Sequence, residues 1–107
     1  MKTLTAPELA HWLADSSRAR PQLLDVREPW EFERCHLAGA ALVPMRELPA
    51  RFNEIEAGAP VVCICHHGTR SAHAAMFLAG QGIADVYNLT GGVDSWARHV
   101  DPAMPTY

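Results

Sequence analysis

No segment of the sequence approaches the ~20 consecutive apolar residues that a membrane-spanning helix needs. The N-terminal stretch also lacks an unbroken apolar core of the length found in signal peptides. Basic residues are few: nine Lys and Arg are scattered along the chain, and twelve Asp and Glu bring the net charge to −3. Since there is no basic stripe, we expect neither nucleic acid nor a membrane as a partner. Because the sequence shows neither a signal-peptide core nor a membrane span, we expect a cytoplasmic protein.

Cysteine, glycine and proline are also sparse. Cys35, Cys63 and Cys65 are an odd number without the spacing of a disulfide framework, which argues against a secreted disulfide scaffold and favours free thiols. Seven Gly and eight Pro, with 49% apolar and 20% charged residues, are typical of a folded globular protein. A length of 107 residues accommodates one domain, residues 1–107, and leaves no room for a second. We expect this domain to be a monomer.

Helical and strand patterns alternate along the chain. Thr5 and Glu8 have the spacing of a capping box, and Leu9, Trp12 and Leu13 follow at helical intervals. Short apolar runs predict strands at 22–26, 40–44, 61–65 and 85–89, and the predicted helices are 6–15, 29–34, 70–80 and 93–100, with one more that turns Leu48, Phe52 and Ile55 inward. Such alternation predicts a mostly parallel α/β sheet.

The run VVCIC, residues 61–65, is apolar on both alternating faces. This pattern predicts a central parallel strand that is covered on each side. Ligands of parallel α/β sheets bind at the carboxyl ends of the strands. Residues 25–27, 65–70 and 90–92 all fall at predicted strand ends, so we expect one pocket to collect them.

The stretch CHHGTRS begins with Cys65, at the exit of this strand and just before a predicted helix. A thiol in that position faces backbone N–H groups and the positive end of a helix dipole, which favour the thiolate form. Gly68 allows the loop unusual backbone angles, and Arg70 can add a fixed positive charge. The residues therefore predict a cysteine nucleophile.

The cysteines allow two other interpretations. A buried structural thiol explains Cys63 well but leaves the Gly, Arg and Ser that follow Cys65 unexplained. Metal binding is disfavoured, because CICHH lacks the usual separation of zinc ligands and no second cluster exists. His36 and His73 are isolated in the sequence. We therefore expect no metal site.

Three blocks of sequence are similar to those of the rhodanese-like sulfurtransferases. CHHGTRS, residues 65–71, resembles the active-site loop of that family. LLDVREPWEFERCHLAGA, residues 23–40, resembles its strand-and-turn signature, and VYNLTGGVDSW, residues 86–96, resembles its closing strand, Gly-Gly turn and tryptophan. Three separated blocks in family order are far more specific than a single cysteine motif.

The resemblance implies a five-stranded, mostly parallel sheet flanked by helices, and a sulfurtransferase without a cofactor. Cys65 would accept a sulfane sulfur from a small donor, thiosulfate or a persulfide, and pass it as a persulfide to a thiol, a protein or another nucleophile. The loop residues that would bind the substrate are His66, His67, Gly68, Thr69 and Arg70. Asp25 and Arg27 are similar to the family's strand-end pair, which we interpret as an ion pair shaping the pocket wall.

Some features depart from the family's pattern. His66 stands where relatives often have Arg or Lys, which makes the pocket less cationic at neutral pH and unfavourable for anionic thiosulfate. Cys35 replaces a common Gly and is interpreted as an apolar filler, and Trp96 as a packing residue. The segment DPAMPTY, residues 101–107, is too polar and Pro-rich for a helix and is expected to fold back on the domain.

Two alternative functions stay open at this point. Rhodanese-like domains can lose their chemistry and act as binding modules, although the retained Cys65 argues against this. Related phosphatases have five residues between Cys and Arg, whereas this chain has only His66 to Thr69, which makes a phosphatase or arsenate reductase the least favoured function.

Overall fold

The computed structural model describes residues 1–107 and contains a sheet of five strands in the order β1-β5-β4-β2-β3. All neighbouring strands are parallel. The strands are β1 (Lys2–Leu4), β2 (Gln22–Asp25), β3 (Ala41–Leu42), β4 (Val61–Ile64) and β5 (Val86–Leu89). The α/β class and the five-stranded parallel sheet are thus confirmed.

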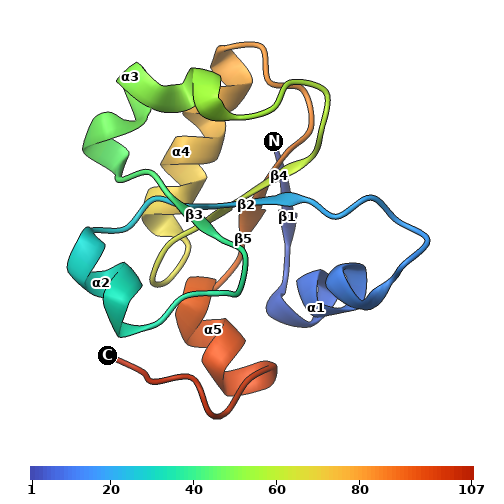
Figure 1. Cartoon of the computed structure of the whole chain (residues 1–107), viewed down its shortest axis with the longest axis vertical. Helices are drawn as coiled ribbons and strands as arrows, with labels where there is room; N and C mark the ends of the chain where they lie inside the picture. The colour runs from blue at the N-terminus through green and yellow to red at the C-terminus, as the bar shows by residue number, and fades with distance from the viewer.

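Helices cover both faces of the sheet. The helices are α1 (Ala6–Ala14), α2 (Pro29–Arg34), α3 (Leu48–Arg51), α4 (Thr69–Gly80) and α5 (Gly92–His99), with 3₁₀ turns at Met45–Glu47 and Phe52–Glu54. In Figure 1, α3 and α4 lie on one side of the sheet and α1 and α5 on the other. No helix has both the length and the apolar character needed to cross a membrane.

Strand β4 lies at the centre of the sheet and separates two hydrophobic clusters. Val61 and Cys63 belong to the cluster under α3 and α4, whereas Val62 and Ile64 belong to the cluster under α1 and α5. All four residues are fully buried. The predicted central strand is therefore confirmed. Burial raises the pKa of the Cys63 thiol to about 12, so Cys63 stays protonated in the core.

Two elements differ from the sequence-based expectation. Strand β1 was not predicted, because only Leu4 of its three residues is buried and so short a segment has no readable alternation. The helix expected around Leu48 to Ile55 is split into α3 and its two flanking 3₁₀ turns. Pro49 explains the first break, because proline is accepted only in the first turn of a helix. The inward-facing residues still pack against the predicted core.

Residues 101–107 fold back across the domain after α5. In Figure 1 this segment ends beside α2, an element that is far from it in the sequence. Arg34 of α2 donates a hydrogen bond to the Thr106 carbonyl at 3.3 Å. Met104 and Tyr107 pack against the cluster under α1 and α5.

Candidate active site

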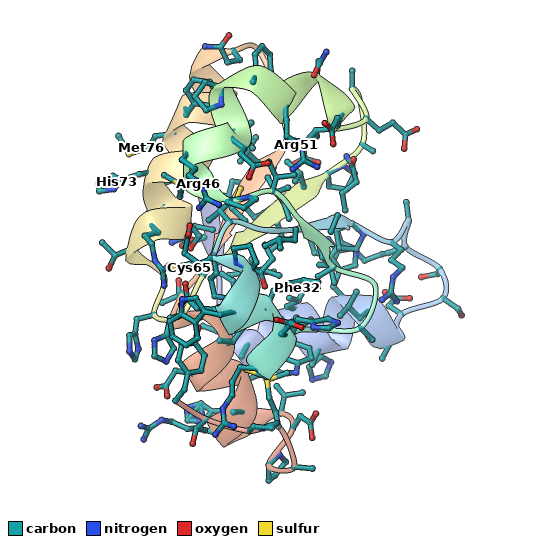
Figure 2. All side chains as sticks on the ribbon, turned by 60° about the vertical axis from the view of Figure 1, so that its left-hand side comes forward. Phe32, Arg46, Arg51, Cys65, His73 and Met76 are labelled. Atoms are coloured by element: carbon teal, nitrogen blue, oxygen red, sulfur yellow. The ribbon has the colours of Figure 1, made fainter.

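Cys65 lies directly after β4, at the bottom of the loop that leads into α4 (Figure 2). The residue is only 1% exposed. The Gly68 N–H donates a hydrogen bond to its sulfur at 3.0 Å. Gly68 has a φ of +101°, and a side chain there would also approach the Gly91 nitrogen to 3.1 Å. Glycine is thus required at this position for the amide to reach the sulfur.

The start of α5 holds the other side of the Cys65 loop. The Val93 N–H donates to the Cys65 carbonyl at 2.9 Å, and the Asp94 N–H donates to the His66 carbonyl at 3.1 Å. A Cβ atom on Gly92 would lie 2.2 Å from the Cys65 carbonyl oxygen, closer than any non-bonded contact allows. Gly91 and Gly92, at the start of α5, therefore let the two backbones meet and fix the loop.

Ser71 and Asn88 support the loop, and neither was among the site residues predicted from the sequence. The Ser71 hydroxyl lies 3.3 Å from the Cys65 sulfur and donates to Asn88 Oδ1 at 2.6 Å. Asn88 Nδ2 donates in turn to the Gly68 carbonyl at 3.1 Å. Asn88 sits in the apolar strand β5, and a polar residue in a buried strand was the available signal.

Arg70 is engaged by an acidic residue of α2. Its Nη1 and Nη2 atoms lie 2.7 and 2.9 Å from the two carboxylate oxygens of Glu31. Glu31 is 4% exposed and also accepts the Glu28 N–H at 3.0 Å. The Arg70 guanidinium lowers the pKa of the Glu31 carboxyl to about 2. The positive charge expected at the loop is therefore compensated.

Asp25 and Arg27 form an ion pair at the end of β2. Arg27 Nη2 lies 2.7 Å from Asp25 Oδ2, and both side chains are fully buried. Arg27 also donates to the Cys35 carbonyl at 2.6 Å. The structure thus brings these two predicted pocket residues together as a pair, and their contribution to substrate binding stays a prediction. Cys35 itself is buried in the hydrophobic cluster under α1 and α5.

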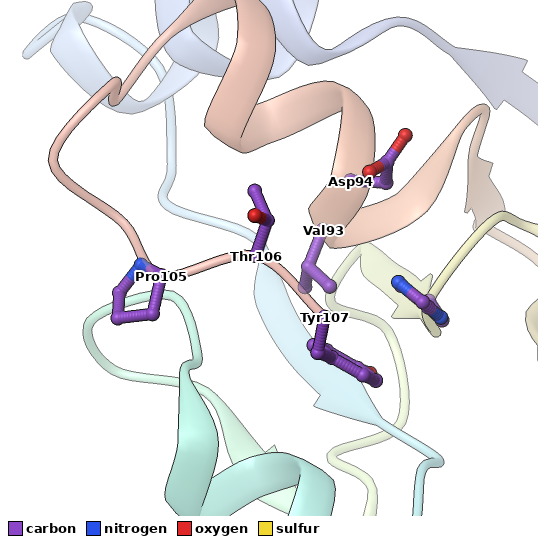
Figure 3. Close-up of a pocket in the computed structure, with 6 residues that line it drawn as sticks. Val93, Asp94, Pro105, Thr106 and Tyr107 are labelled. Carbon is purple, nitrogen blue, oxygen red and sulfur yellow. The ribbon is translucent and has the colours of Figure 1, made fainter.

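The two histidines of the loop lie at its outer side. His67 and Thr69 are exposed, whereas His66 is partly covered by the ring of Tyr107, which stacks on it with 3.8 Å between ring centres. Burial, and then the neighbouring His67, lower the pKa of His66. His66 therefore adds little positive charge at neutral pH. Figure 3 shows Tyr107 beside Val93 and Asp94, at the cleft between α5 and the C-terminal segment.

His66 and His67 also approach Asp94 of α5. Their ring nitrogens and the Asp94 carboxylate lie within 4.8 Å of one another, which is the spacing of a group that could hold a metal ion. This grouping could not be predicted from the sequence, because Asp94 is far from the loop along the chain. Two contacts compete with metal binding: the histidine rings face each other at 3.9 Å, and Asp94 already accepts from Arg98 Nε at 3.0 Å.

A buried thiol on a glycine-dependent loop between a parallel strand and a helix is the architecture that the sequence resemblance implied. The model of the rhodanese-like domain family matches residues 5–99. The chain therefore belongs to the rhodanese-like domain family.

Several relatives extend this assignment. The chain is 42% identical over 100 residues to the Bacillus subtilis protein YqhL, described as uncharacterized, covering 94% of this chain and 75% of that one. It is 35% identical over 98 residues to the thiosulfate sulfurtransferase GlpE of Pseudomonas aeruginosa (strain LESB58), covering 92% and 86%. Among solved structures, a rhodanese-like domain protein from Staphylococcus aureus matches with a TM-score of 0.85 and 30% identity, covering 100% and 99%.

Proposed function

We propose that this protein is a sulfurtransferase in which Cys65 carries the transferred sulfur. The hydrogen bond from the Gly68 N–H to the Cys65 sulfur carries this proposal, because a donor at that position stabilises a negatively charged sulfur. The name of the GlpE relative supports the same class of reaction.

In the first step, the Cys65 thiolate attacks the sulfane sulfur of the donor. With thiosulfate, the sulfur–sulfur bond of the donor breaks, sulfite leaves with the bonding pair, and Cys65 becomes a persulfide anion. In the second step, an acceptor thiolate attacks the outer sulfur of this persulfide. The acceptor leaves as its own persulfide and Cys65 returns to the thiolate, so no external oxidant or reductant is consumed.

The bonds around the loop support this cycle. The Cys65 and His66 carbonyls accept hydrogen bonds from α5, which would keep the loop in one conformation while the Cys65 side chain gains and loses a sulfur atom. The three cysteines are free thiols, which supports our proposal that the protein works in the reducing cytoplasm.

The proposal is tested by transfer of sulfur from a donor to cyanide or to a thiol, measured for the wild type and for three cysteine variants. Cys65→Ser should abolish transfer, whereas folded Cys35→Ser and Cys63→Ser should retain it. Full activity of Cys65→Ser would disprove the proposal.

A further inference from the structure

Tyr107 connects the C-terminal segment to the charged groups behind the Cys65 loop. Its hydroxyl donates to Glu31 Oε2 at 2.8 Å and accepts from Arg27 Nη1 at 2.8 Å. Its ring also meets the edge of the exposed Trp30 side chain, with 5.6 Å between ring centres. One residue thereby links α2, the end of β2 and the loop itself.

These contacts leave both arginines of the site with compensated charge. Arg27 is held by Asp25 in a fully buried ion pair. Arg70 is held at both nitrogens by Glu31, and the hydroxyl of Tyr107 keeps that carboxylate in place. A dianion entering the site would have to compete with Glu31 for the guanidinium of Arg70, because both terminal nitrogens of Arg70 are already bound to that carboxylate.

The histidines of the loop do not supply a further positive charge in place of the two compensated arginines. The Tyr107 ring covers His66, and the neighbouring His67 lies 3.9 Å from the Asp94 carboxylate. Both carboxylates near the loop already have arginine partners, Arg70 for Glu31 and Arg98 for Asp94, so the surroundings of Cys65 offer no unpaired cation to a dianion.

We propose that Glu31 and Tyr107 make the Cys65 site selective for sulfur donors of low charge, so that small organic persulfides are used in preference to thiosulfate. This inference rests on the proposed sulfurtransferase function. With such a donor, the Cys65 thiolate attacks the terminal sulfur of the protonated persulfide, RS–SH. The bond between the two donor sulfurs breaks, the thiolate RS⁻ leaves, and Cys65 carries the S–SH group. No sulfite-like dianion has to be accommodated.

In this scheme Glu31 acts on donor choice through Arg70, and Tyr107 acts through Glu31. Both are positioning residues, and neither needs to touch the reacting sulfur. Glu31→Gln keeps the shape of the side chain but removes the charge that compensates Arg70. Tyr107→Phe keeps the ring over His66 but removes the hydroxyl that anchors Glu31 and Arg27.

The test compares kcat/KM for thiosulfate, a dianion, with kcat/KM for the persulfide of N-acetylcysteine methyl ester, whose only ionisable group is the persulfide and whose charge is therefore at most −1. Glu31→Gln should raise the thiosulfate-to-persulfide ratio by about threefold or more, mainly through a lower KM for thiosulfate. Tyr107→Phe should shift the ratio in the same direction by a smaller factor. In the double variant, Tyr107→Phe should add no further change, because its hydroxyl acts through Glu31.

Tyr87→Phe is the matched control, since this tyrosine lies on β5 and contacts Trp12 and Lys2 instead of the loop. Its ratio should equal that of the wild type, and the melting temperature of every variant is measured alongside. If Glu31→Gln does not fold, Tyr107→Phe decides the question alone. Activity with an unchanged ratio in the folded variants would overturn the assignment of the donor class. A wild type that uses neither donor would instead contradict the sulfurtransferase function itself.

Discussion

Arg70 and Glu31 form a two-point ion pair, with their nitrogen and oxygen atoms 2.7 and 2.9 Å apart, between the start of α4 and helix α2. Glu31→Gln should lower the free energy of unfolding at pH 7 by about 2 kcal/mol, because hydrogen bonds to a charged group contribute about 1.5–3 kcal/mol. Chemical denaturation measures this difference. Glu33→Gln on the exposed face of α2 is the control and should change stability little.

The same ion pair predicts how this loss depends on pH. The pKa of Glu31 is about 2 in the folded protein, below its ordinary value of 4.5, because of Arg70. The stabilisation is therefore fully present above pH 4.5 and is lost as the pH falls towards 2. The stability difference between wild type and Glu31→Gln should shrink over this interval. A difference that stays constant between neutral pH and pH 2 would contradict this description of Glu31.

Gly92→Ala should damage both stability and sulfur transfer, since its new methyl group would lie 2.2 Å from the Cys65 carbonyl oxygen. We expect a loss of about 2 kcal/mol or more in the free energy of unfolding. Gly82→Ala is the matched control: Gly82 has a similar positive φ of +88° but nothing within 4 Å of the added atom. Equal losses in the two variants would mean that backbone strain alone, and not contact with the loop, explains Gly92.

His66→Arg should lower the KM for thiosulfate, because it places a permanent positive charge beside the loop. Burial and the adjacent His67 lower the pKa of His66, so its charge is absent at neutral pH and returns only below the ordinary pKa of 6.5. The thiosulfate KM of the wild type should therefore fall as the pH drops from about 8 to about 5, and the variant should show a weaker dependence. A flat wild-type profile, together with an unchanged or higher KM in His66→Arg, would exclude a role for this histidine in donor binding.

Hydrolysis of aryl phosphates should be negligible beside sulfur transfer. Only four residues separate Cys65 from Arg70, so the loop has less room for a phosphoryl group than the five-residue loop of the related phosphatases. Arg70 is also already paired with Glu31. Release of the aryl alcohol is measured in parallel for the wild type and Cys65→Ser. Phosphate-ester turnover that disappears in Cys65→Ser would show that the loop accepts phosphate after all.

Much of the fold was readable from local patterns. The continuous apolar run at 61–65 predicted the central strand, observed as Val61–Ile64, and the Thr5–Glu8 spacing predicted a capping box that the structure contains. Strand β1 was missed because its pairing with β5 depends on a partner more than eighty residues away, and its own three residues carry little signal.

The supporting residues of the site were harder to predict. Cys65, Gly68 and Arg70 occur in one short motif, whereas Glu31 and Tyr107 reach the loop only through tertiary contacts. In the sequence, Glu31 is one of several acidic residues in a helical segment, and nothing there shows that it becomes buried against Arg70. The fold-back of residues 101–107 was expected, but the position of Tyr107 over His66 was not.

The formation of a persulfide on Cys65 is the central claim, and intact-mass measurement tests it most directly. The wild type is incubated with a sulfane-sulfur donor, freed of excess donor and weighed by mass spectrometry, with peptide mapping to locate any addition. We predict a gain of one sulfur atom on Cys65 that a thiol acceptor removes and that Cys65→Ser does not acquire. No gain in mass, or the same gain in Cys65→Ser, would contradict the account.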